Sequence, residues 1–156
     1  MTNGKSINTK DGIIVGWDID LLQYKSPYIG DASNVSNLLN ELPFGEYKNK
    51  ISLDTEKEPY GLSADYDLTQ FHESDMDFIY KTILRNSAVL FSLIENLDTI
   101  RYNIKMGNSS YNYEFTRSSL EKIYFDQDLR EYSRDQGEFA KLISFKDIPS
   151  LLPRPR

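Results

Sequence analysis

Apolar side chains recur along the chain at two spacings, and each spacing predicts a different kind of element. The most regular helical stripe lies between about residues 75 and 96, a stretch without Gly or Pro. Its apolar positions fall three or four residues apart, as one face of an α-helix requires. They are Met76, Ile79, Tyr80, Ile83, Leu90, Phe91, Ile94 and Leu97. The second half is apolar nearly all round, which predicts a central core helix.

Strict alternation of apolar and polar residues predicts strands elsewhere. One alternating run covers residues 60–68, and a shorter one covers 51–54. After the long helix, alternating stretches at 100–105 and 111–115 flank Gly107-Asn108-Ser109, residues that favour a turn. These two stretches therefore predict a β-hairpin.

Shorter helical patterns lie on both sides of these elements. One helix is expected to begin at Asp31 or Ser33 and to end near residue 42, before Pro43. Others are expected at 118–124 and at 128–143, and Asp18 is expected to cap a short turn at 19–22. Residues 13–15 form either a short strand or an extended entry segment.

This order of elements predicts an α+β fold. We expect a mainly antiparallel sheet of about four strands packed on the long central helix, with short N-terminal and C-terminal helices. A chain of 156 residues is most simply one domain. We assign residues 1–17 to a flexible leader and entry segment, 18–143 to the domain, and 144–156 to a tail with Pro and Arg.

Composition narrows the classes of partner and of chemistry. The chain has 18 Lys and Arg against 24 Asp and Glu, a net charge of −6, and such a surface repels nucleic-acid phosphates. It has no Cys, which excludes disulfides, thiolate metal sites and a cysteine nucleophile. No apolar run reaches the roughly 18 residues of a membrane helix. Any membrane anchor is therefore expected outside this chain.

The catalytic and metal-binding patterns that we considered are weak. His72, the one histidine, could join Asp75 and Asp77 at a metal, but acids and caps ordinarily gather where a helix begins. Paired acids could serve a glycosidase or bind calcium, although a solvated strand face or helix capping explains them more simply. These pairs are Asp18/Asp20, Asp65/Asp67, Asp75/Asp77 and Asp126/Asp128. We predict no catalytic residue, no metal site and no cofactor.

Two groups of residues are candidates for binding. Near the start of the first helix, Gly30 permits an unusual backbone angle, and free N–H groups there could hold an anion. This candidate site comprises Tyr28, Gly30, Asp31, Ser33 and Asn34, with simple capping as the favoured alternative. The second group is Tyr102, Tyr111 and Tyr113 of the hairpin. They form either core or an aromatic surface for a peptide or glycan, and a helix-covered sheet favours core.

Several segments together suggest a family. They are YKSPYIGDASNV at 24–35, Leu42-Pro43, EPYGL at 58–62, NSAVLFSLIENLD at 86–98, the Tyr-rich hairpin, and DLREYS at 128–133. As a set they resemble an uncharacterised domain of Gram-positive bacteria. That domain is similar to the extracytoplasmic part of some BlaR/MecR-type antirepressor membrane metallopeptidases, and it also occurs in stand-alone anchored proteins. The resemblance covers about residues 18–143 and implies a location on the cell-surface side of a bacterial membrane, with the cytoplasm as the alternative.

From these observations we expect a non-catalytic extracytoplasmic sensor or accessory binding domain. Its partner is expected to be a protein, a peptide or a small-molecule ligand, and not nucleic acid. Two alternatives stay open at this point: a carboxylate-dependent hydrolase, and a domain that docks to or inhibits another protein. The hydrolase would need two acids facing each other across a cleft.

Overall fold

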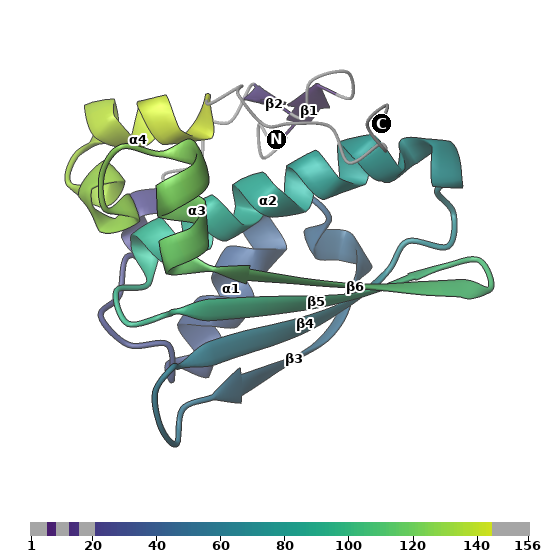
Figure 1. Cartoon of the computed structure of the whole chain (residues 1–156), viewed down its shortest axis with the longest axis horizontal. Helices are drawn as coiled ribbons and strands as arrows, with labels where there is room; N and C mark the ends of the chain where they lie inside the picture. Colours follow the sequence, from purple (N-terminus) through teal and green to yellow (C-terminus); the bar gives the residue numbers. More distant parts are fainter. Residues whose placement is uncertain (1–5, 9–12, 16–20, 145–156) are drawn as a thin grey trace.

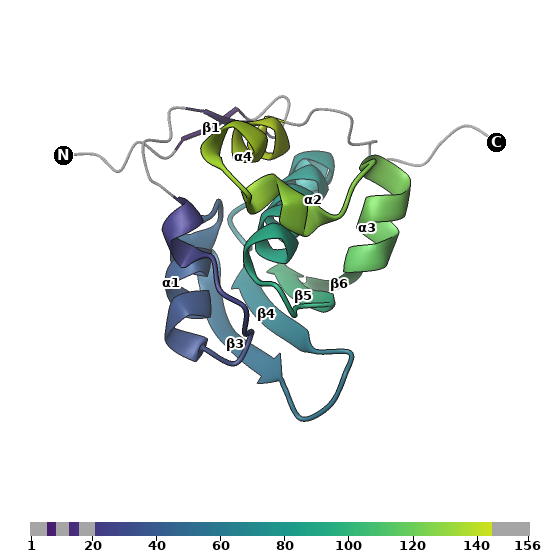
Figure 2. The same cartoon turned by 90° about the vertical axis from the view of Figure 1, so that its left-hand side faces the viewer.

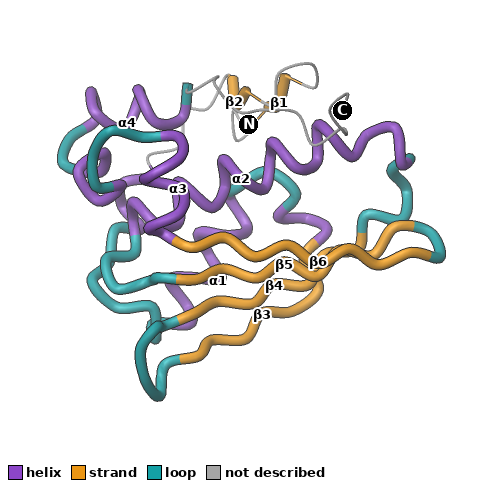
Figure 3. The backbone as a smooth tube through the Cα atoms, in the orientation of Figure 1, coloured by secondary structure: helices purple, strands orange, loops and turns teal. Residues whose placement is uncertain are grey.

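The computed structural model describes residues 6–8, 13–15 and 21–144. Helices cover one side of a four-stranded sheet, as Figures 1 and 3 show. The sheet contains β3 (Lys48–Asp54), β4 (Gly61–Asp67), β5 (Thr99–Met106) and β6 (Ser109–Thr116). The α-helices are α1 (Ala32–Glu41), α2 (Met76–Leu93), α3 (Arg117–Tyr124) and α4 (Gln136–Ile143). The 3-10 helices are η1 (Leu21–Tyr24), η2 (Gly45–Tyr47), η3 (Glu73–Asp75) and η4 (Leu129–Ser133). Strands β1 (Ser6–Asn8) and β2 (Ile13–Val15) form a separate antiparallel pair.

The α+β class is confirmed, but the sheet is mixed and not uniformly antiparallel. Its order is β3-β4-β5-β6, and the central pair β4/β5 runs parallel, from Gly61 opposite Thr99 to Asp67 opposite Lys105. The expectation of antiparallel pairing is therefore wrong for these two strands. The reason is the long helix, which leaves the end of β4 and returns the chain to the beginning of β5. A helix of 18 residues is about 27 Å long, enough to span the strands in one crossover.

Alternation along the strands places one face of the sheet against the helices. On β5 the even-numbered residues Ile100, Tyr102, Ile104 and Met106 are buried, and the odd-numbered ones from Arg101 to Lys105 are exposed. The opposite face of the sheet carries no helix among the described residues (Figure 2). The buried face and the apolar stripe of α2 form the core, as the spacing of apolar residues predicted.

The helix α2 ends where another segment of the chain pairs with it. Ile94 adopts an extended conformation and forms a parallel bridge with Ser26. The Ser26 amide donates to Leu93 O at 2.8 Å, and the Glu95 amide donates to Ser26 O at 2.8 Å. The segment 25–27 is thereby fixed beside the C-terminal end of α2.

A single buried arginine satisfies the carbonyl groups at that end. Arg117, the first residue of α3, donates to Phe91 O at 2.5 Å, to Ile94 O at 2.9 Å and to Leu97 O at 2.6 Å. A further bond reaches Glu95 O at 3.2 Å, and the guanidinium lies 5.3 Å from the centre of the Phe91 ring. Burial lowers the pKa of Arg117 to about 10, so the side chain remains charged at neutral pH.

The predicted C-terminal helix at 128–143 is divided into η4 and α4. Each part begins with its own aspartate cap. The Asp128 carboxylate accepts from the Arg130 amide at 2.8 Å, and the Asp135 carboxylate accepts from the Glu138 amide at 2.8 Å. The helices predicted near 31–42 and 118–124 are confirmed as α1 and α3. The turn expected at Asp18, and most of the expected leader and tail, lie outside the described residues.

We expect Arg117→Met to lower the free energy of unfolding by about 2–4 kcal/mol, because buried carbonyls would lose their donors. The matched control is Arg101→Met on the exposed face of β5, where the pair with Glu114 is half exposed. That substitution should change stability by less than about 1 kcal/mol. Urea unfolding followed by circular dichroism measures both. Equal losses in the two variants would contradict the role assigned to Arg117.

Candidate functional site

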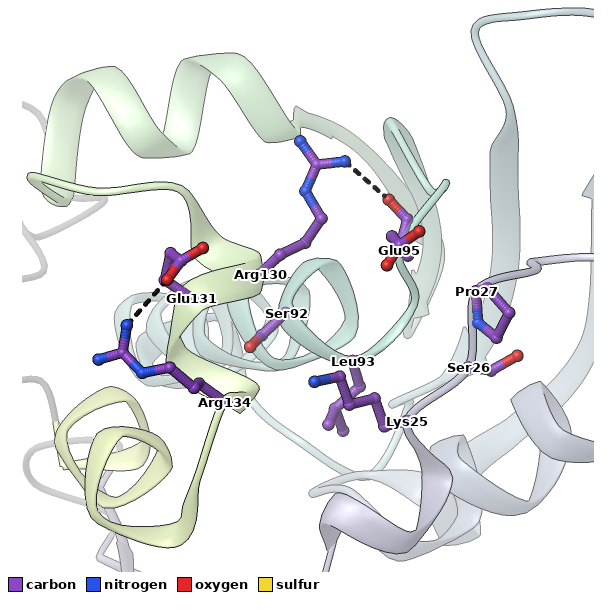
Figure 4. Close-up of a pocket in the computed structure, with 9 residues that line it drawn as sticks. All are labelled: Lys25, Ser26, Pro27, Ser92, Leu93, Glu95, Arg130, Glu131 and Arg134. Carbon is purple, nitrogen blue, oxygen red and sulfur yellow. Dashed lines mark hydrogen bonds and ion pairs between the residues drawn. The ribbon is translucent and has the colours of Figure 1, made fainter.

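The described part of the chain contains a cleft beside the C-terminal end of α2, and we call it the α2 cleft. It lies between the segment 25–27, the end of α2 and η4 (Figure 4), and its volume is about 390 Å³. Its lining residues are Lys25, Ser26, Pro27, Ser92, Leu93, Glu95, Arg130, Glu131 and Arg134.

Hydrogen bonds fix the two walls of the α2 cleft to each other. The Lys25 ammonium donates to Ser133 O at 3.1 Å, which joins the segment 25–27 to η4. The Ser133 hydroxyl donates to Ser92 O at 2.9 Å, which joins η4 to α2. Ser133 is 3% exposed, so it joins the two walls from within the protein and holds the shape of the site.

One polar atom in this region lacks a partner. Ser92 is 1% exposed, and its hydroxyl makes no hydrogen bond in the structure. In Figure 4 the Ser92 hydroxyl and the Lys25 ammonium both point into the space between the two walls. A buried hydroxyl without a partner is energetically unfavourable, by about 1–3 kcal/mol. A ligand oxygen in the α2 cleft could supply the missing bond.

The two arginines of the α2 cleft are already held by acids. Arg130 makes a two-pronged contact with Asp128, at 2.9 and 2.8 Å, and also donates to Glu95 O at 3.2 Å. The hydrogen bonds from Arg130 lower the pKa of Asp128 to about 2, so this pair stays charged over the physiological range. Arg134 lies 2.9 Å from Glu131 and 3.6 Å from Glu138.

Lys25 differs from the arginines in its contacts. No carboxylate of the described residues lies within ion-pair distance of its ammonium. The ammonium donates instead to a backbone carbonyl, Ser133 O. The lining has three cationic side chains against two acidic ones, a net charge of +1 in a chain of net −6. Because Asp128 balances Arg130 and Glu131 balances Arg134, Lys25 is the lining cation that no carboxylate of the described residues neutralises.

The residues predicted at 28–34 are used for local structure. The Asp31 carboxylate accepts from the Asn34 amide at 3.1 Å and thus caps α1. The Asn34 side chain donates to Tyr24 O at 2.8 Å, and the Tyr28 ring lies so close to Gly30 that a Cβ there would clash with it. Ser33 is exposed. Since the Asp31 carboxylate occupies the end of the helix, an anion would be repelled there, and this geometry favours the capping alternative.

The three hairpin tyrosines are placed differently from one another. Tyr102 is fully buried, with its hydroxyl 2.7 Å from Ser87 Oγ and 3.3 Å from Ile83 O. This placement puts Tyr102 in the core, the alternative that the sequence favoured. Tyr111 and Tyr113 are partly buried on β6; Tyr111 donates to Glu73 at 3.2 Å, and the Tyr113 ring lies 5.7 Å from that of Tyr80.

His72 and the pairs Asp65/Asp67 and Asp75/Asp77 lie apart from the α2 cleft, whereas Asp128 is bonded to Arg130 of its lining, and Asp18 and Asp20 fall outside the described residues. His72 is exposed at the start of η3, and its amide donates to the Asp75 carboxylate at 3.0 Å. Asp77 pairs with Lys81 at 3.2 Å, and Asp65 accepts from Asn103 at 2.8 Å. Within the described ranges, no three His, Asp or Glu side chains are grouped so that they could hold a metal ion.

Sequence reasoning did not identify the α2 cleft. Its residues come from three segments that the sequence separates widely, and no spacing rule brings them together. One signal was available: Ser92 is a polar residue within the run at 88–94 that is apolar nearly all round. A hydroxyl in such a run is either bonded back to its own helix, as Ser87 is to Ile83 O at 2.8 Å, or directed to something else.

Comparison with known proteins gives one match. A family model described as a domain of unknown function (DUF4825) matches residues 21–116. No curated protein and no solved structure matches the chain. Among the described helices, none has the length and apolar character needed to cross a membrane. The matched region contains Lys25 and Ser92 of the α2 cleft and ends before α3 and η4.

The two buried tyrosines of the sheet should respond oppositely to loss of their hydroxyls. Tyr102→Phe should cost about 1 kcal/mol, because it removes the bond with Ser87. Tyr66→Phe should leave stability unchanged or raise it, because the buried Tyr66 hydroxyl makes no hydrogen bond.

Burial raises the pKa of Tyr66, so the unfolded chain ionises first and stability falls as pH rises above about 10. Tyr66→Phe should weaken that fall, and urea unfolding at neutral and alkaline pH tests both effects.

Proposed function

Since the chain belongs to the DUF4825 family, a domain of unknown function, we propose its function from its own geometry. We propose that it is a non-catalytic binding domain whose α2 cleft takes the carboxylate group of a peptide or small molecule. A volume of about 390 Å³ lies within the range of small-ligand sites, which is roughly 300–1,000 Å³.

The observation that carries the proposal is the Ser92 hydroxyl, buried without a hydrogen bond in the wall of the α2 cleft. A hydroxyl can donate one hydrogen bond, and a carboxylate oxygen is an acceptor only. A bound carboxylate would therefore relieve an unfavourable feature of the free protein. That relief would add to the affinity.

Lys25 supplies the charge that such a ligand needs. An ammonium has three N–H donors, and one of those on Lys25 is directed to Ser133 O. The remaining donors are available for a carboxylate, and charge-assisted bonds of this kind are about twice as strong as neutral ones. Arg130 and Arg134, held by Asp128 and Glu131, form the opposite wall of the α2 cleft.

The location of the domain is a second part of the proposal. We propose that it works on the outer side of the membrane of a Gram-positive bacterium, beside or attached to a membrane protein of the BlaR/MecR type. The support is the resemblance of residues 24–35, 86–98 and 128–133 to that class.

Binding is tested with short peptides that carry a free C-terminal carboxylate, compared with the same peptides amidated at that end. We expect the free acids to raise the melting temperature and the amides to have no effect. Lys25→Met should weaken binding by about tenfold or more, the equivalent of one charge-assisted bond. Isothermal titration calorimetry measures the change.

The matched control for Lys25→Met is Lys105→Met, which removes an exposed cation on β5. Ser92→Ala gives a second readout: it should weaken binding while leaving the stability of the free protein unchanged or higher. If acids and amides bind alike, or if the two lysine variants lose affinity equally, the proposed carboxylate site is wrong.

The proposed location is tested in cells. A tagged form of the full-length protein, expressed in a Gram-positive host, should be cleaved by a protease added outside intact cells. A cytoplasmic protein of the same host is the control and should be protected. Protection of both proteins would contradict an extracytoplasmic location.

A further inference from the structure

The strand β6 forms an open edge of the sheet. Among the described strands it pairs only with β5, through an unbroken register from Thr99 opposite Thr116 to Met106 opposite Ser109. It contains no Pro, Lys or Arg, and its single charge, Glu114, is paired with Arg101 at 3.0 Å. A regular and nearly uncharged edge of this kind readily pairs with another strand.

The opposite edge of the same sheet is built differently. Strand β3 has a register shift between Lys48 and Lys50, which disrupts the regular row of backbone groups. It also carries Lys48, Lys50 and Asp54, charges that discourage pairing with a further strand. Only one of the two edges is therefore protected.

We propose that β6 pairs antiparallel with β6 of a second copy of the chain, so that one continuous sheet runs through both copies. This interaction surface is independent of the α2 cleft and of the function proposed for it. The two-fold axis passes through Asn112, the centre of residues 109–115, because the next residue, Thr116, accepts from the Ser119 amide at 3.2 Å and caps α3.

The residues of β6 are self-complementary in this register. In an antiparallel pair with β5, every second residue of β6 directs its N–H and C=O groups away from β5. Pairing about Asn112 keeps the helix-covered faces of both copies on the same side. On the exposed face Ser110 meets Glu114 of the second copy, and on the helix side Tyr111 meets Tyr113 of the second copy. No like charges are opposed, and aromatic cross-strand pairs are favourable.

A groove of mixed polar and apolar lining next to this edge leaves room for a partner there. It lies between α2, the end of β6 and α3, has a volume of about 370 Å³, and is lined in part by Tyr80, Phe115 and Ile123. Ile123 is 67% exposed, so its side chain is accessible to a partner. In the proposed register, Ser109 of the second copy lies opposite Phe115 and brings its chain beside this groove.

The test uses charge at the two-fold axis. Residue 112 of one copy lies opposite residue 112 of the second copy. Asn112→Asp and Asn112→Lys should therefore each sediment as monomers, because each variant would place two like charges opposite each other. An equal mixture of the two variants should form a heterodimer, since opposite charges then meet across the axis. The wild-type protein should shift from monomer to dimer as its concentration rises. Sedimentation velocity and native mass spectrometry measure these states.

The matched controls are Ser52→Asp and Ser52→Lys, which place the same charges at an exposed position on β3. They should dimerise as the wild type does, and circular dichroism should show that all variants are folded. A wild type that stays monomeric at every concentration overturns the proposal. So do Asn112 variants that dimerise separately, or a mixture that forms no heterodimer. None of these results bears on carboxylate binding in the α2 cleft.

Discussion

The arrangement of the domain depends on how the C-terminal end of α2 is closed. The last carbonyl groups of a helix have no partners within the helix, and water must satisfy them unless the protein does. Here that end is buried beneath the chain that follows it. Arg117 supplies the donors, because a guanidinium carries five N–H groups in one plane and reaches four carbonyls at once. One side chain thus joins the end of β6 to the loop that leads into β5.

This closure also shapes the α2 cleft. With the loop after α2 held by Arg117, Ile94 and Glu95 present an extended backbone to which Ser26 pairs. That pairing brings Lys25 within reach of η4, and Ser133 then bonds to both sides. The polar groups of the site are therefore placed by backbone pairing and by side-chain hydrogen bonds to backbone carbonyls. Such placement keeps a binding geometry ready before the ligand arrives.

The sequence predicts the parts of this structure that depend on local patterns. Residue spacing was enough for α2 and for the buried face of β5, because a helix and a half-buried strand each impose a fixed period on their apolar side chains. It was not enough for the parallel pairing of β4 with β5, which depends on where a crossover returns the chain. Nor could spacing show that Arg117 is buried, since a charged residue after a strand is ordinarily exposed. The candidate residues at 28–34 illustrate the same limit: their pattern is shared by caps and anion sites, and only the position of the Asp31 carboxylate separates the two.

The two walls of the α2 cleft have different origins within the chain. Lys25 and Ser92 lie in the region matched by the family model, whereas Arg130, Glu131 and Arg134 follow it. The matched region alone would leave the end of α2 without Arg117 and the Lys25 ammonium without its bond to Ser133. The segment 117–144 therefore does two things: it completes the fold and it encloses the site. In the proposed function, attraction for a carboxylate comes from the matched region, and the shape of the opposite wall comes from η4. A change in η4 would alter which ligands fit without removing the groups that attract them.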